Sequence, residues 1–185
     1  MLKITVTAKE GFNNKTNEFV TLDHDVTICL EHSLVSISKW ESKWHKPFLS
    51  KDQKTNEEVI DYVRCMTITQ NVPPNTYYLL SQQNLKEINS YIENPMTATT
   101  FTNNATGKPA SSNKEIITSE VLYYWMSKYN LPYKFETWHL NRLITLIRVC
   151  SVKEGSSTNK MSKRETAMSN KAINDARRKQ YNTKG

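Results

Sequence analysis

The chain has few glycines and cysteines and lacks a long apolar run. It contains 4 glycines and 3 cysteines in 185 residues. The scattered glycines cannot form the glycine-rich loop that holds phosphates, and no G-x-S-x-G nucleophile motif is present. No stretch reaches the roughly 18 apolar residues of a transmembrane helix, so we expect no membrane partner. Cys29, Cys65 and Cys150 are odd in number and lie in apolar stretches, which indicates buried free thiols in a reducing compartment.

The first residues contain no apolar segment followed by a small-residue cleavage site. We therefore expect no signal peptide and an intracellular origin. The length suits one ordinary domain with an appendage, and 37% hydrophobic residues can supply a core.

Positive charge is concentrated at the end of the chain. The formal net charge is +7. Residues 1–150 hold 16 Lys and Arg against 15 Asp and Glu, whereas residues 151–185 hold 9 against 3. This asymmetry predicts an arm that docks on an acidic partner, either protein or nucleic acid.

The first 30 residues have the alternating pattern of β-strands. Strands are predicted at residues 2–8, 18–22 and 26–30, with a turn at 11–15, as a small antiparallel meander. Later segments change to helical spacing. Helices are predicted over residues 33–44 and 120–129. Another begins after a capping box at Thr55 and Glu58 and turns Val59 and Ile60 towards the core, and a fourth begins after an N-cap at Ser81. Residues 97–113 form an exposed loop with room for an edge strand at 97–102.

Residues 137–152 are the densest apolar segment. Their apolar side chains cover more than half of a helical wheel, which predicts a central packing helix held on several sides. It follows the 120–129 helix closely enough to form a helical hairpin. A helix-turn-helix DNA reader is disfavoured, because its second helix must present polar side chains to the major groove.

The chain changes character after residue 152. Residues 153–160 have the composition of a flexible linker, and Ser162 with Glu165 forms a second capping box. The helix that follows, to about residue 180, carries many cations and only a narrow apolar stripe, so it cannot hold itself on a monomer. We predict an α+β body over residues 1–152 and a basic linker with a helical arm over 153–185. The β-meander packs on the mainly helical part of the body.

Candidate chemical sites are weak. Cys29 and His32 have a C-x2-H spacing with His24 nearby, but no second pair completes a zinc site, which favours a buried cysteine beside surface histidines. Glu57, Glu58 and Asp61 are explained by the favourable position of acids near a helix N-terminus. We therefore predict no catalytic residues, no metal and no cofactor.

The helix over 33–44 is a second candidate contact surface. Lysines alternate there with Trp40 and Trp44, a pattern that could stack bases, contact a protein or simply pack in a core. The arm itself has three interpretations: a solvated helix, a partner-binding arm that orders on docking, and a nonspecific phosphate contact through Arg177, Arg178 and Lys179. The predicted partner-binding residues are Lys163, Arg164, Lys171, Arg177, Arg178, Lys179, Trp40 and Trp44.

Two stretches resemble a family of small tailed-bacteriophage proteins. One is residues 31–49, EHSLVSISKWESKWHKPFL. The other runs from YWM at 124–126 through WHLNRLITLIRVC at 138–150, followed by MSKR at 161–164 and ARRK at 176–179. The resemblance covers about half of the chain and implies a protein encoded among virion morphogenesis genes and associated with tail assembly or structure. It transfers no functional residue.

Together these features predict a non-enzymatic phage protein of the tail or connector region, acting as an adaptor or a tail assembly chaperone. Its partners would be other phage structural proteins, with a homo-oligomer or ring as the assembled form. Its location would be the virion or the host cytoplasm during assembly. The alternative is a nucleic-acid-binding protein whose arm contacts phosphates.

Overall fold

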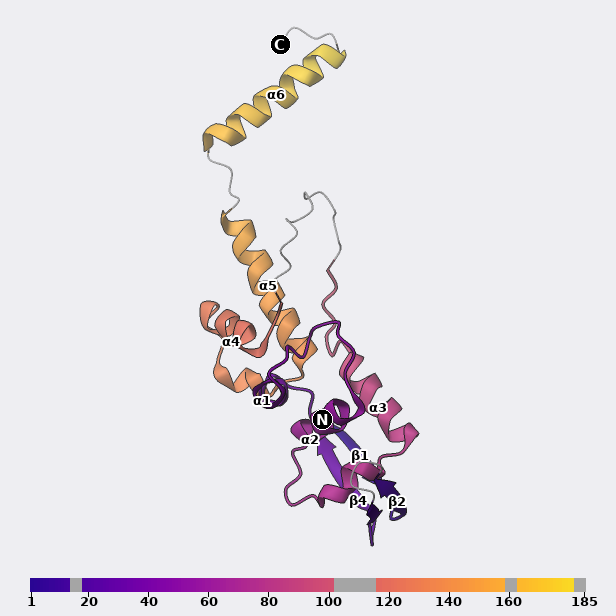
Figure 1. Ribbon diagram of the computed structural model, residues 1–185. Coiled ribbons are helices and arrows are strands. Elements are labelled where there is room, and N and C mark those ends of the chain that lie inside the picture. Colours follow the sequence, from indigo (N-terminus) through magenta and orange to yellow (C-terminus); the bar gives the residue numbers. More distant parts are fainter. Residues whose placement is uncertain (14–17, 102–115, 159–162, 182–185) are drawn as a thin grey trace. The chain divides into compact units, whose positions relative to one another are not determined.

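The computed structural model describes residues 1–13, 18–101, 116–158 and 163–181 (Figure 1). Within these ranges, the side chains of residues 13, 155–158, 163–167, 169, 172, 179 and 180 are outside the description. The chain divides into two compact units, Met1–Ile147 and Arg148–Gly185. Strands and helices are segregated along the first unit, which confirms the predicted α+β class.

The N-terminal strands form one antiparallel ribbon made of two short ladders. Strand β1 (Leu2–Val6) pairs with β4 (Val26–Leu30), and β2 (Glu10–Asn13) pairs with β3 (Glu18–Thr21). A bond from the Leu22 amide to the Lys9 carbonyl (3.1 Å) continues the pairing between the ladders. The antiparallel pairing was predicted, but the meander order is wrong because the first strand pairs with the last.

The expected turn at residues 11–15 is also wrong at its start, because Gly11 and Phe12 belong to β2. A Cβ atom at Gly11 would lie 2.5 Å from Cδ2 of Leu79. The glycine therefore marks a close approach between the ribbon and the 3₁₀ helix η1 (Pro74–Leu79), as isolated glycines in strands often do.

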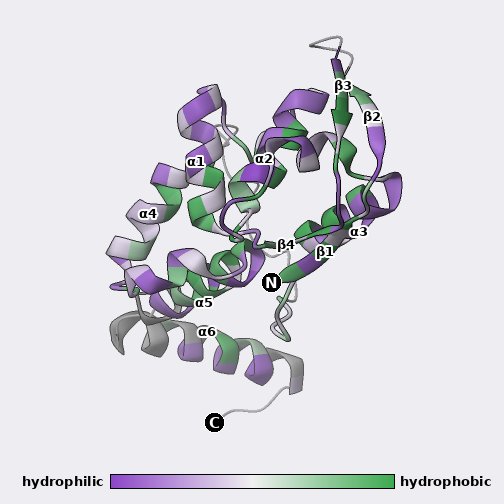
Figure 2. Ribbon diagram, turned by 90° about the horizontal axis from the view of Figure 1, so that it is seen from below, coloured by the Kyte–Doolittle hydropathy of each residue, from purple (hydrophilic) through white to green (hydrophobic). Residues whose placement is uncertain are grey.

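Helix α1 (Leu34–Trp44) is the central element of the first unit. It packs against α2 (Asn56–Met66), α4 (Ser119–Lys128) and the 3₁₀ helix η2 (Tyr133–Thr137). Its Leu34, Ile37 and Trp40 are almost completely buried and recur at three-residue spacing. Figure 2 shows the green, apolar surfaces of these helices turned toward one another.

The helix boundaries follow the capping signals in the sequence. The predicted capping box of Thr55 and Glu58 is confirmed at α2, and Ser81 caps α3 (Gln82–Glu93) together with Asn84. Two smaller predictions are wrong. Val59 is exposed rather than in the core, and residues 97–101 form no strand; Thr102 lies outside the described residues.

The segment after β4 ties the ribbon to the helices. The Glu31 amide donates to the Met66 carbonyl at the end of α2 (2.9 Å), and the Leu140 amide donates to the His32 carbonyl (2.7 Å). Consequently the strand, the C-terminus of α2 and the start of α5 (Leu140–Thr158) meet at one point.

Glu41 adds a second tie, between α1 and α4. One carboxylate oxygen accepts from the Ser119 amide at the start of α4, and the other accepts from the Phe48 amide, both at 2.7 Å. Thr118 occupies the N-cap position of α4 but forms no side-chain capping bond. The carboxylate of Glu41, from a distant part of the chain, therefore binds a free amide at the start of α4.

The predicted role of the 137–152 segment as the central helix is not supported. In α5, Leu140, Leu143 and Ile147 are buried, whereas Ile144 and Leu146 are only partly covered. The three- and four-residue spacing places just one stripe against the core. Residues 133–137 form η2, so α5 begins at Leu140 rather than at the predicted residue 137.

Helix α5 continues to Thr158, so residues 153–158 are helical and the linker prediction is wrong for them. The rest of the predicted linker, residues 159 and 160, and the predicted capping residue Ser162 lie outside the described residues. The predicted arm helix is confirmed as α6 (Lys163–Tyr181). The division between the two units falls within α5, a few residues before the boundary expected at 152.

Candidate functional site

The basic arm places all six predicted cations on α6. Lys171, Arg177 and Arg178 are exposed. The side chains of Lys163, Arg164 and Lys179 lie outside the description, although their backbone belongs to the same helix. Every α6 side chain that the structure describes is exposed, apolar ones included.

The exposed residues of α6 have an ordered arrangement around the helix. At 100° per residue, Met168, Ile173 and Ala176 fall within a single arc of less than half the circumference. Lys171 and Arg178, seven residues apart, flank one edge of this arc, and Arg177 flanks the other. Met168 is 62% exposed and Ile173 48%. Asp175 falls between Met168 and Lys171 on the same wheel, and the position of Lys179 falls within the arc. The helix thus presents three apolar residues in one arc that is flanked mainly by cations.

The second predicted contact surface, on α1, is placed differently. Trp40 is only 1% exposed, and its indole N–H donates to the Glu58 carbonyl (2.9 Å). Its ring packs against Trp44 and Phe48, with centroids 6.2 and 5.1 Å away. Trp40 is therefore a core residue that offers no surface to a partner, which corrects its place among the predicted contacts. The helical spacing that suggested an aromatic surface reflects burial.

Trp44 and the nearby lysines are used in a contact between α1 and α2. The Trp44 indole donates to Asp61 (2.9 Å), Lys43 pairs with the same carboxylate (2.5 Å), and Lys46 pairs with Glu58 (2.6 Å). The hydrogen bond from Lys46, followed by that from the Thr55 backbone, lowers the pKa of the Glu58 carboxyl. Glu58 lies in the first turn of α2, as predicted, whereas Asp61 lies further along the helix, which corrects that prediction. Both are also buried ion-pair partners. Sequence spacing did not reveal this.

The largest departure from the sequence interpretation is a pair of buried histidines. His32 was expected at the surface but is 2% exposed, and its ring lies 5.2 Å from that of His139, also buried. His32 Nδ1 and the Tyr62 hydroxyl form a hydrogen bond of 2.5 Å. Burial, with a smaller effect of His139, lowers the pKa of His32 to about 3.

The second histidine of the pair has a defined tautomer. His139 Nε2 lies 3.0 Å from the Tyr91 carbonyl oxygen, which can only accept, so Nε2 carries the proton. Its Nδ1 has no hydrogen-bond partner among the described residues. The two histidines are 107 positions apart in the chain. No local motif joins them, and only the pairing of residues 32–33 with 139–140 brings them together.

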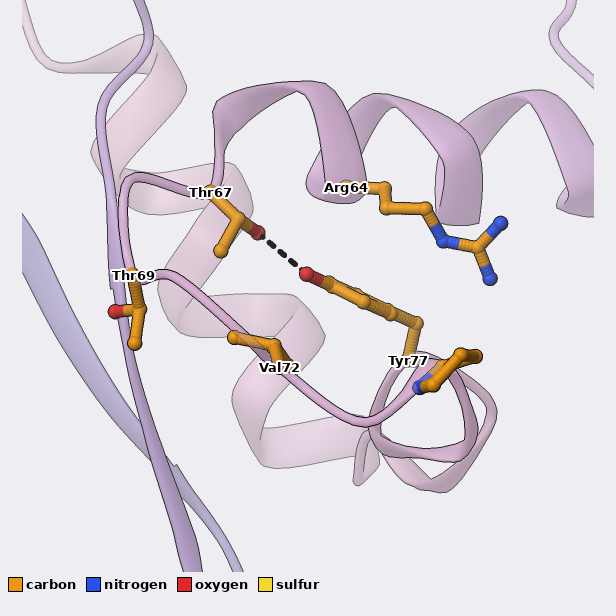
Figure 3. Close-up of a pocket in the computed structure, with 6 residues that line it drawn as sticks. Arg64, Thr67, Thr69, Val72 and Tyr77 are labelled. Atoms are coloured by element: carbon orange, nitrogen blue, oxygen red, sulfur yellow. Dashed lines mark hydrogen bonds between the residues drawn. The ribbon is translucent and has the colours of Figure 1, made fainter.

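A pocket of about 320 Å³ lies where α2, η1 and the residues after α2 meet. Figure 3 shows the Arg64 side chain beside the Tyr77 ring and the Tyr77 hydroxyl directed at Thr67. The Arg64 guanidinium carbon lies 5.0 Å from that ring centre, and the Tyr77 hydroxyl donates to Thr67 Oγ1 (3.1 Å). Thr69 Oγ1 accepts from the Cys29 amide (2.8 Å).

These polar groups are engaged mainly with one another and with the backbone. Thr67 Oγ1 also donates to the Val63 carbonyl (2.8 Å). Among the described lining residues, Arg64 has a buried Nε without a hydrogen-bond partner. One such donor does not make the convergent set expected of a ligand site, so the pocket is best explained as a polar seam that joins α2, η1 and the strand end.

Among the described residues, no group of three or more His, Cys, Asp and Glu side chains is arranged to hold a metal ion. The described helices likewise include none long and apolar enough to cross a membrane. Comparisons of the chain with protein-family models, curated proteins and solved structures found no match.

Proposed function

We propose that this protein is a non-enzymatic bacteriophage structural or assembly protein that docks on neighbouring subunits through its C-terminal helix. It serves as an adaptor of the tail or connector region or as a tail assembly chaperone. The observation that carries the proposal is α6: a 19-residue helix on which every described side chain is exposed.

A helix of this kind gains little stability from contacts within its own chain. Isolated helices of about 15 residues are marginal in water, and protein helices are mostly stabilised by packing one face. The exposed Met168 and Ile173 supply such a face, and the cations beside it favour an acidic partner. A helix that orders fully when it docks explains both its length and its lack of packing.

The resemblance of residues 31–49 and 138–150 to small tailed-phage proteins supplies the setting. In that setting the partner is another structural protein of the tail or connector, and the protein works in the virion or in the host cytoplasm during assembly. Salt sensitivity is expected, because exposed charge pairs are screened within about 10 Å at 0.1 M salt.

Particle assembly tests this proposal. In the phage that encodes the chain, Arg177→Glu with Arg178→Glu should reduce the yield of infectious particles at least tenfold. Lys39→Glu with Lys86→Glu makes the same charge change at two exposed positions on α1 and α3, and should leave the yield near wild type. Equal yields from the two double variants would contradict a docking role for α6.

The alternative function is nucleic-acid binding by the same helix, and the exposed pair Arg177 and Arg178 favours it. Phosphate contacts release counterions, so affinity for DNA would fall steeply and linearly on a log–log plot against salt. A steep slope for the whole protein that disappears in Arg177→Glu with Arg178→Glu would support this alternative. Salt-independent or undetectable binding leaves the protein-docking proposal in place.

A further inference from the structure

The β2–β3 hairpin carries an exposed aromatic pair. Phe12 and Phe19 lie directly opposite each other in the ladder, with ring centroids 5.2 Å apart in an edge-to-face arrangement. Phe12 is 51% exposed and Phe19 79%. In Figures 1 and 2 the hairpin lies at the far end of the first unit from α4.

The two faces of this hairpin differ because successive strand residues point to opposite sides. One face, with Gly11 opposite Val20, is partly covered and approaches Leu79 of η1. The other face, with Phe12 opposite Phe19, has no cover among the described residues. The aromatic pair therefore contributes little to the core of its own unit.

Acidic residues are frequent in this part of the ribbon. Glu10 lies two residues before Phe12 and so on the aromatic face, whereas Glu18, next to Phe19 in the strand, lies on the opposite face of the hairpin; both are exposed. Asp23 and Asp25 are exposed further along the ribbon. Residues 10–25 hold four Asp and Glu against one Lys, whereas Lys163–Tyr181 holds six Lys and Arg against two Asp and Glu.

The hairpin and α6 are thus complementary in both charge and apolar pattern. The hairpin offers two aromatic rings with carboxylates nearby, and α6 offers Met168 and Ile173 flanked mainly by cations. Methionine packs well against aromatic rings. Because both surfaces belong to the same chain, a copy whose α6 is engaged still has a free hairpin.

We propose that the hairpin of one copy receives α6 of a second copy, in a head-to-tail contact. This proposal rests on the docking role of α6 proposed above and names a second copy of the chain as the partner. A head-to-tail contact between different surfaces closes into a ring or continues as a filament, according to its rotation.

Sedimentation velocity of the purified full-length protein tests the contact through charge reversal. The arm variant is Arg177→Glu with Arg178→Glu, and the hairpin variant is Glu10→Lys with Glu18→Lys. All four residues are exposed, and circular dichroism checks that each variant keeps its fold. At low salt the wild type should form species larger than a dimer, and each double variant alone should be at least tenfold weaker in self-association.

Mixing the two variants gives the decisive result. The arm variant retains an intact hairpin and the hairpin variant an intact arm, so the mixture should associate although each variant alone does so weakly. The reversed arm also matches the reversed hairpin in charge, so both the mixture and the quadruple variant, which carries all four substitutions, should form species larger than a dimer. A wild type that stays monomeric, or a mixture that does not associate, would overturn the proposal. A monomeric wild type is also the result expected if α6 docks on the hairpin of its own chain.

The particle yield of each variant tests the proposed docking function of α6 separately from self-association. If the arm variant lowers particle yield but the hairpin variant does not, α6 docks on another protein and the hairpin assignment is wrong. If neither variant lowers the yield, the docking function itself fails.

Discussion

His32 and His139 show how single residues set the properties of this fold. Both imidazoles are buried, and the His32 ring faces His139 on one side and the Tyr62 hydroxyl on another. A charged imidazolium held between the His139 ring and the Tyr62 hydroxyl would lose its hydration. The fold therefore favours neutral His32, which is the cause of its low pKa.

The consequence is a stability that depends on pH. The pKa of His32 is about 3 in the folded protein, against 6.5 for an ordinary histidine, so the unfolded chain binds more protons between these values. The free energy of unfolding should therefore fall as pH falls from about 6.5, with a contribution from His32 of about 2 kcal/mol lost at pH 5.

Urea titrations at pH 7.5 and pH 5 measure this change. His32→Gln should remove that part of the difference between the two pH values, whatever its effect at either one. His24→Gln is the matched control, because His24 is exposed. An unchanged pH dependence in His32→Gln would show that His32 is not kept neutral by the fold.

Trp40 gives a second prediction for a single residue. Trp40→Phe removes the indole donor and leaves the buried Glu58 carbonyl without that bond, which should cost about 1–3 kcal/mol of stability. Trp44→Phe should cost less, because Trp44 is partly exposed and water can replace part of the lost bond to Asp61. Both are measured by urea unfolding. Equal costs for the two, or a cost near zero for Trp40→Phe, would contradict the core position of Trp40.

At the scale of elements, local signals predicted most of the structure. The predicted capping residues Thr55 and Ser81 each form the side-chain bond that the sequence suggested, so α2 and α3 start where predicted. Helix α1 was predicted from its periodicity alone, and Ser33 forms its N-cap. Caps and periodicity act over three or four residues and can be read directly from the sequence.

Contacts between distant residues were not predictable in this way. The pairing of β1 with β4, the Glu41 bonds to α4 and the pair of buried histidines all join residues far apart in the chain. The dense apolar segment 137–152 misled for the same reason: apolar content predicts burial, but not which helix the others pack around. Charge and composition predicted the arm helix and its cations. The exposed aromatic pair of the hairpin, Phe12 and Phe19, has no signal in the sequence beyond the two phenylalanines themselves.

Helix α5 offers a test at this scale, because composition predicted a linker where the structure has a helix. Gly155 lies within α5 and lowers its stability relative to alanine by about 0.5–1 kcal/mol. Gly155→Ala should therefore raise the helical content of residues 148–158, and Gly155→Pro should abolish it around that position. Cα chemical shifts from NMR measure both changes. Shifts typical of random coil over 153–158 in the wild type would show that the linker prediction was right.

At the scale of the whole molecule, the chain combines a unit with its own core and a helix with an uncovered surface. All residues of the main buried cluster lie at or before Ile147. The net positive charge lies after that point, because residues 1–147 hold 15 Lys and Arg against 15 Asp and Glu, and residues 148–185 hold 10 against 3. This division suits the assembly role proposed above, in which the body keeps its fold and α6 would supply the free energy of attachment to a neighbour.

The most direct test of arm docking is a photo-crosslink from α6 during phage assembly. A photoreactive amino acid at position 173 should crosslink to a phage structural protein or to a second copy of this chain, and mass spectrometry identifies the partner. The same probe at Ile68, an exposed apolar residue of the body, is the control and should give little product. Crosslinks from position 173 to nucleic acid alone, or no more protein product than from position 68, would contradict the proposal that α6 docks on a neighbouring subunit.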